Sequence, residues 1–166
     1  MYSDARAVYN RVCEMNALIL GMGNTIMTDD GVGVHASRAA RSLLAETDLV
    51  DVVEAEVAGF ALLDLLRDRE RVVIIDALTD AGRTPGEVSV ERLDAFRPTR
   101  HLCTGHEIDL PTAIELGRQM GYEMPGEIHL VVVVVEDART LGEACTPAVE
   151  RAIEPAARLA LDLARG

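Results

Sequence analysis

Short apolar runs of strand length recur along this chain, and segments in which apolar residues return at helical spacing separate them. The pattern predicts strands at residues 17–21, 49–57, 71–78, 88–90 and 127–135, and helices at residues 31–45, 59–67, 110–120 and 147–164. Strands that alternate with helices favour parallel βαβ units. We therefore expect an α/β fold: a three-layer sandwich with a twisted, mostly parallel (mixed) sheet of about five strands and helices on both faces. We expect a single domain over residues 1–166.

Local signals place several boundaries. In GEVSVERL, residues 86–93, apolar and polar positions alternate, which predicts a more exposed strand near an edge of the sheet. Asp109 is well placed to cap the helix whose first turn accepts Pro111. Thr146 and Pro147 begin the last helix, and Pro155 predicts a kink in it.

The charge of the chain excludes some partners. With 28 acidic against 16 basic residues, the net charge is -12, and no basic cluster offsets it, so we expect no nucleic-acid partner. The longest apolar run, at residues 130–135, is far shorter than the ~20 residues that span a bilayer, and the N-terminal stretch does not look like a secretory signal. The three cysteines form no Cys-x-x-Cys pair, so we expect reduced thiols in a cytoplasmic protein.

The glycine-rich turn GMGNTIMTDDGVG, residues 21–33, follows the first strand and opens the first helix. Ile26 stands where a dinucleotide fingerprint needs its third glycine, and the turn has no lysine for a phosphate loop. Asp29 and Asp30 would oppose a phosphate at a helix N-terminus, but they can face a cation or a water molecule. The turn predicts a cation or proton-transfer site; the alternative is that Asp29 and Asp30 merely cap the helix. Thr28 or Asp29 is the expected cap.

Asp76 directly follows the apolar run VVII of the third predicted strand. The carboxyl edge of a parallel sheet is where ligands gather, which favours a functional role for this carboxylate. The alternative is a structural role in which Asp76 accepts backbone N–H bonds from the following loop. His35 is not included in the site, because five helical residues turn it by about 140° away from Asp30.

A later loop, RHLCTGHEIDL, carries two histidines and Cys103. Cys103 and His106 could form half of a zinc site, but the chain has no second pair with structural spacing, and Leu110 interrupts a His-Glu-x-x-His motif. No Gly-x-Ser-x-Gly elbow supports a serine hydrolase. Neither Cys13 nor Cys145 has a histidine nearby in the sequence, so a thiol protease is not supported. His106, in a loop just ahead of a helix, is the best imidazole for a site.

Together, GMGNTIMTDDGVG, VVIIDAL and GHEIDLPTAIELG resemble the motifs of the endopeptidases that mature nickel-iron hydrogenases. The resemblance extends through VEDARTLGEACTPAVERAI and so covers nearly the whole chain. It implies that Asp30, Asp76 and His106 bind a metal and act as the catalytic residues. It also implies a metal-dependent protease that removes a C-terminal extension from the hydrogenase large-subunit precursor after nickel insertion. The nickel would arrive with the precursor, and we expect no organic cofactor, no membrane partner and a monomer.

The resemblance leaves several points open. Many relatives have Glu at the position of Asp30, and many have a Gly-Gly-Thr loop where residues 56–60 read EVAGF, so the precursor recognised is not fixed. Either the metal activates the attacking water, or Asp30 or Asp76 acts as general base while the metal is only recognised. Two other functions are a hydrogenase-subunit chaperone or binding module that does not cleave, and a nucleotide-binding regulator.

Overall fold

The computed structural model describes residues 17–55, 61–92 and 110–166. In this part of the chain, five strands form one sheet in the order β2-β1-β3-β5-β4. Their bounds are β1 (Ala17–Met22), β2 (Val50–Ala55), β3 (Arg71–Leu78), β4 (Val88–Arg92) and β5 (Glu127–Val134). β1, β2, β3 and β5 are parallel, whereas β4 pairs antiparallel with β5 at the edge. The predicted mixed, mostly parallel sheet and its edge strand are confirmed.

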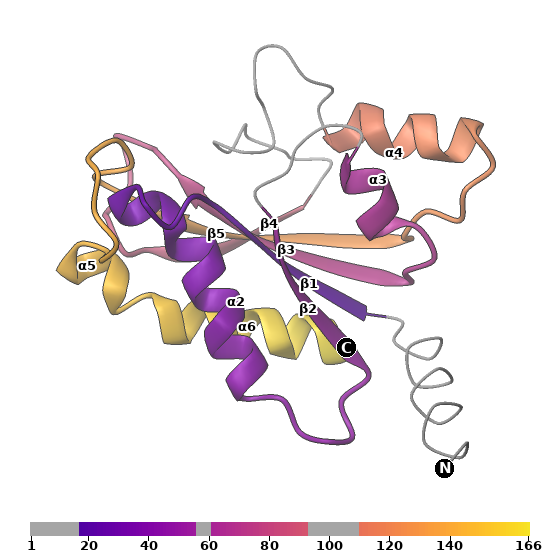
Figure 1. The fold of residues 1–166 in the computed structure, drawn as a ribbon, viewed down its shortest axis with the longest axis horizontal. Coiled ribbons are helices and arrows are strands. Elements are labelled where there is room, and N and C mark those ends of the chain that lie inside the picture. The colour runs from indigo at the N-terminus through magenta and orange to yellow at the C-terminus, as the bar shows by residue number, and fades with distance from the viewer. Residues whose placement is uncertain (1–16, 56–60, 93–109) are drawn as a thin grey trace.

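Helices cover both faces of the sheet, as predicted. α2 and α6 lie on one face, and α3 and α4 lie on the other (Figure 1). The bounds are η1 (Thr28–Gly31, a 3-10 turn), α2 (Val32–Ser42), α3 (Ala61–Leu66), α4 (Leu110–Gln119), α5 (Pro147–Glu150) and α6 (Ile153–Arg165). No helix in the described part of the chain is long and apolar enough to cross a bilayer.

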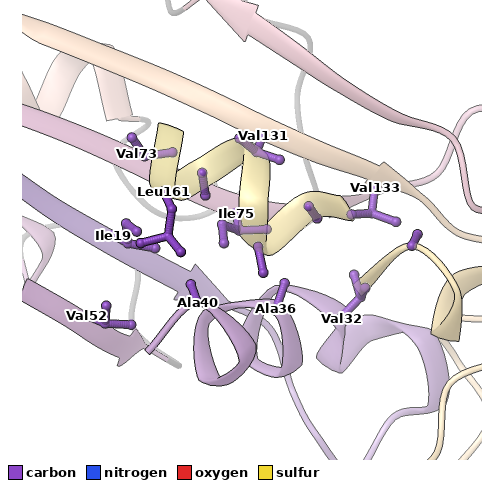
Figure 2. Close-up of a cluster of buried hydrophobic side chains, with 14 of the residues drawn as sticks. Ile19, Val32, Ala36, Ala40, Val52, Val73, Ile75, Val131, Val133 and Leu161 are labelled. Carbon is purple, nitrogen blue, oxygen red and sulfur yellow. The ribbon is translucent and has the colours of Figure 1, made fainter. Parts of the chain in front are cut away.

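Two apolar cores lie on opposite faces of the sheet. Val73 and Ile75 of β3 point to the α2 and α6 face, where they pack with Leu161 (Figure 2). Val72 and Ile74 of the same strand belong to the other core, beneath α3 and α4. A strand that is buried on both faces carries a continuous apolar run, which explains the uninterrupted valines and isoleucines of β3 and β5.

Most boundaries match the sequence pattern, with one clear correction. No side chain caps η1 or α2, and Gly31 is the N-cap of α2, so the predicted cap by Thr28 or Asp29 is wrong. Pro155 does interrupt the last helix: α5 ends at Glu150 and α6 begins at Ile153, because a proline in the first turn of α6 gives no N–H to Arg151.

Several predicted features fall outside the described residues. These are the cap by Asp109, the loop at residues 56–60 and the cysteines Cys13 and Cys103.

Candidate metal and catalytic site

The turn that carries the two adjacent aspartates is folded tightly against itself. Gly23 has a φ of +144°, a conformation that favours glycine, and a Cβ at this position would collide with the carbonyl oxygen of Asp30. The amide of Asp30 also donates a hydrogen bond of 2.8 Å to the carbonyl of Met27. The backbone of Asp30 is therefore fixed immediately beyond the end of β1.

Gly33 brings the first turn of α2 directly onto the sheet. A Cβ on Gly33 would collide with the carbonyl oxygens of Met22 and Ile75, which belong to the neighbouring strands β1 and β3. Because β1 and β3 are parallel, this contact lies at their common carboxyl edge. Asp30, three residues before Gly33, lies at the same edge, where η1 packs against β3.

Asp76 lies within β3, two residues before the strand ends at Leu78. The two-residue period of the strand places its side chain on the face of Ile74 and Leu78, toward α3 and α4. The carboxylate is fully buried, and its Oδ1 accepts a hydrogen bond of 2.8 Å from the amide of Ala77. Backbone support of the kind considered above is therefore present, from the amide of the next residue.

Asp30 and Asp76 are thus two buried carboxylates on adjacent elements, 3% and 0% exposed. His106, the third residue of the predicted set, lies outside the described residues. Among residues 17–55, 61–92 and 110–166, no three His, Cys, Asp or Glu side chains cluster as a metal site. Two carboxylates alone suit hard cations such as magnesium or manganese, and an added imidazole would extend the set to nickel.

Asp29 has a different role from Asp30. Its fully buried carboxylate accepts four hydrogen bonds: from the amides of Glu136 (3.3 Å), Asp137 (3.0 Å) and Thr146 (2.6 Å), and from the Thr146 hydroxyl (3.1 Å). Its own amide donates to the carbonyl of Asp137 at 2.9 Å. Asp29 therefore joins the turn to the segment between β5 and α5, a role that sequence reasoning missed because these partners lie 107 to 117 residues away.

Cys145 lies beside this junction and is a free thiol. Its Sγ donates to the carbonyl of Thr28 at 3.6 Å. Burial, followed by the nearby charges of Asp29 and Glu150, raises the pKa of Cys145 to about 11. A thiol with so high a pKa is a poor nucleophile at neutral pH, in keeping with the absence of a thiol-protease motif.

His35, on α2, lies next to Gly31 at the end of the turn. Its Nε2 is buried and has no hydrogen-bond partner among the described residues, and it would lie 3.3 Å from a Cβ placed on Gly31. Burial and the charge of Arg38 lower the pKa of His35, and Glu150 and Glu54 oppose this shift. The imidazole therefore favours its neutral form, beside the site but outside the predicted ligand set.

A hollow of about 470 Å³ lies at the opposite, amino edge of the sheet. Asp48 and Glu127 line it together with Arg165 and Arg71, and each acid pairs with one of these arginines at 2.7 Å. The guanidinium groups lower the pKa of both carboxyls. Asp48 and Glu127 are already matched by cations, so the carboxyl edge is the stronger candidate for chemistry.

Comparison with known proteins assigns the chain. Residues 34–163 match the family described as hydrogenase maturation protease. The chain belongs to this family. It is 31% identical to the hydrogenase 2 maturation protease of Escherichia coli K12, over 86% of each chain.

Solved structures of the family share the fold. The hydrogenase maturating endopeptidase HybD from Escherichia coli superposes with a TM-score of 0.74 at 28% identity, over 89% of this chain and 90% of that one. The [NiFe] hydrogenase maturation protease HybD from Thermococcus kodakarensis gives a TM-score of 0.65 at 25% identity, over 90% and 99%. The predicted family, the α/β fold and the endopeptidase class are confirmed.

Proposed function

We propose that this endopeptidase removes the C-terminal extension of a nickel-iron hydrogenase large-subunit precursor once nickel has been inserted. Asp30, Asp76 and His106 would together contact the nickel that the precursor carries. The metal is then part of the substrate, and no organic cofactor is needed.

The observation that supports this proposal is the burial of two carboxylates at one edge of a parallel sheet. An ionised carboxylate that leaves water loses much solvation energy unless a cation or several hydrogen-bond donors replace the water. A divalent ion bound at this edge would find carboxylate ligands in both Asp30 and Asp76. The carboxyl edge is also where open α/β sheets bind ligands.

The side chains then have separable tasks. Bound nickel would supply Lewis acidity toward the scissile carbonyl or an attacking water. The hydrogen bond from the Ala77 amide orients the Asp76 carboxylate through its Oδ1. Asp30 is held by the folded turn around Gly23. A carboxylate within reach of the attacking water can accept its proton, and this general-base role is the second mechanism that the residues allow.

The test uses the full chain and purified large-subunit precursor in two forms, nickel-loaded and metal-free, with mass spectrometry of the products. We expect a short C-terminal peptide to be released from the nickel-loaded form alone. Equal cleavage of both forms would show that nickel plays no part in recognition. Stable binding of the precursor with no cleavage would instead support the non-cleaving chaperone.

A further inference from the structure

The most exposed large apolar side chains in the described part of the chain lie on two touching loops. Leu141 is 75% exposed and Ile26 is 56% exposed. Met27 forms an antiparallel bridge with Leu141, and the amide of Gly142 donates to the carbonyl of Ile26 at 3.1 Å. We call residues 24–28 and 137–142 the paired loops.

The paired loops lie beside the candidate site. In the sheet order, β3 lies between β1 and β5, and all three strands are parallel. The loop after β1 and the loop after β5 therefore meet beyond the carboxyl end of β3, the strand that carries Asp76. Figure 1 shows the two segments side by side, one leading into α2 and the other into α5. The hydrogen bond from the Asp30 amide to Met27 joins the first loop directly to the site.

Hydrogen bonds hold this junction in one geometry. Asp29 accepts four of them from Glu136, Asp137 and Thr146, and the Thr28 hydroxyl donates to the carbonyl of Thr140 at 2.8 Å. The exposure of Ile26 and Leu141 is therefore not a consequence of a loose loop. Apolar side chains that are held exposed in advance lose little conformational entropy when a partner covers them.

We propose that the paired loops bind the precursor polypeptide next to the scissile bond, with Ile26 and Leu141 in contact with its apolar side chains. Asp29 is the positioning residue that fixes the paired loops. The bound molecule is the precursor polypeptide because the paired loops adjoin the candidate site, and an endopeptidase must hold its substrate along the edge that carries Asp30. The charge of the second loop also limits which segment of the precursor can bind there. Three acids, Glu136, Asp137 and Glu143, lie in or beside this loop with one base, Arg139, which disfavours an acidic segment. This proposal rests on the proposed function.

The first test compares Ile26→Ala and Leu141→Ala with Met120→Ala and Leu49→Ala. The two control residues are 54% and 47% exposed, and neither belongs to the paired loops. With nickel-loaded precursor, we expect each loop variant to raise KM about fivefold to tenfold with kcat unchanged, because it removes binding that substrate and transition state share. The controls should match the wild type. An unchanged KM in both loop variants would overturn the proposal.

Variants at the junction test the positioning role of Asp29. Asp29→Asn places an amide N–H against donors, because Oδ1 faces the Thr146 amide and Oδ2 faces the other three. We expect KM to rise in Asp29→Asn and in Thr146→Val, and to remain at the wild-type value in Thr146→Ser, which keeps both donors. If KM rose as much in Thr146→Ser as in Thr146→Val, Asp29 would not act through the paired loops. The same conclusion would follow if kcat alone fell in Asp29→Asn.

A binding measurement separates this proposal from the proposed function. Calorimetry with the uncleaved precursor gives Kd for the wild type and for Leu141→Ala. Binding that Leu141→Ala weakens, without any cleavage by the wild type, would overturn the proposed function and leave the docking surface standing. Cleavage with equal Kd in both proteins would overturn the docking surface alone. A wild type that does not bind the precursor would overturn both.

Discussion

At the carboxyl edge of the sheet, Asp29, Asp30 and Asp76 are at most 3% exposed, whereas the acids of the amino edge remain partly in solvent. There Asp48 pairs with Arg165 and Glu127 pairs with Arg71. The donors to Asp29 at the carboxyl edge are neutral amides and a hydroxyl.

The acids of the amino edge pair with arginines, whereas Asp29 at the carboxyl edge accepts hydrogen bonds from neutral groups. An arginine that pairs with an acid neutralises it, and in solvent such pairs contribute little to stability. Neutral N–H and O–H donors, such as those to Asp29, stabilise a buried carboxylate without cancelling its charge. The amino edge is therefore suited to maintaining the surface, and the carboxyl edge to chemistry.

The largest expected effect comes from removing charge at the carboxyl edge. Asp30→Asn and Asp76→Asn should each lower the cleavage rate of nickel-loaded precursor about a hundredfold or more, because both proposed roles need the carboxylate. The matched change at the amino edge, Asp48→Asn, should leave the rate unaltered. Single-turnover cleavage measures the rates, and circular dichroism checks that each variant is folded. A fully active Asp76→Asn variant would show that cleavage does not need the charge of this carboxylate.

The next effect concerns packing at the same two edges. Gly33→Ala should lower the free energy of unfolding by about 3 kcal/mol, because the new Cβ meets the backbone carbonyls of Met22 and Ile75. Gly126→Ala, just before β5 at the amino edge, meets nothing within 4 Å and should change stability by less than about 0.5 kcal/mol. Denaturant unfolding of both variants provides the measurement. Equal losses would show that α2 does not need this close approach.

A smaller effect concerns the pH dependence of stability near the site. The pKa of His35 is lowered in the folded protein, so the unfolded chain takes up a proton first as the pH falls below the ordinary value of 6.5. Stability should therefore be greatest above that pH and should decrease below it. His35→Gln should remove this part of the decrease, which unfolding curves at about pH 7.5 and 5.5 would reveal. Identical pH dependence in the variant would show that His35 is readily protonated in place.

The smallest effect is expected for the ion pairs of the amino edge. Arg165 lowers the pKa of Asp48, so the pair stabilises the fold above the ordinary pKa of the carboxyl, and this stabilisation is lost as the pH falls through the lowered value. Asp48→Asn should lower the melting temperature slightly near neutral pH. The difference should shrink in acid and in high salt, which screens exposed charges. A large loss that persists in salt would indicate a structural role beyond the ion pair.

Much of the fold could be predicted because its signals are local. The unbroken apolar runs of β3 and β5 follow from burial on two faces, and the break before α6 follows from the missing N–H of Pro155. The candidate site could be predicted only in part from such local signals. Asp30 and Asp76 stand out because each interrupts or follows an apolar stretch, but the cap expected for Asp29 was wrong.

The succession of strands and helices along the chain, and the two acids in a glycine turn, could be read from the sequence alone. The structural role of Asp29 became visible only in the fold, since the donors to Asp29 come from residues 136–146, more than 100 positions later. Local periodicity carries no record of such a contact. It forms only when the parallel alignment of β1, β3 and β5 brings the loops after β1 and β5 together at one edge of the sheet.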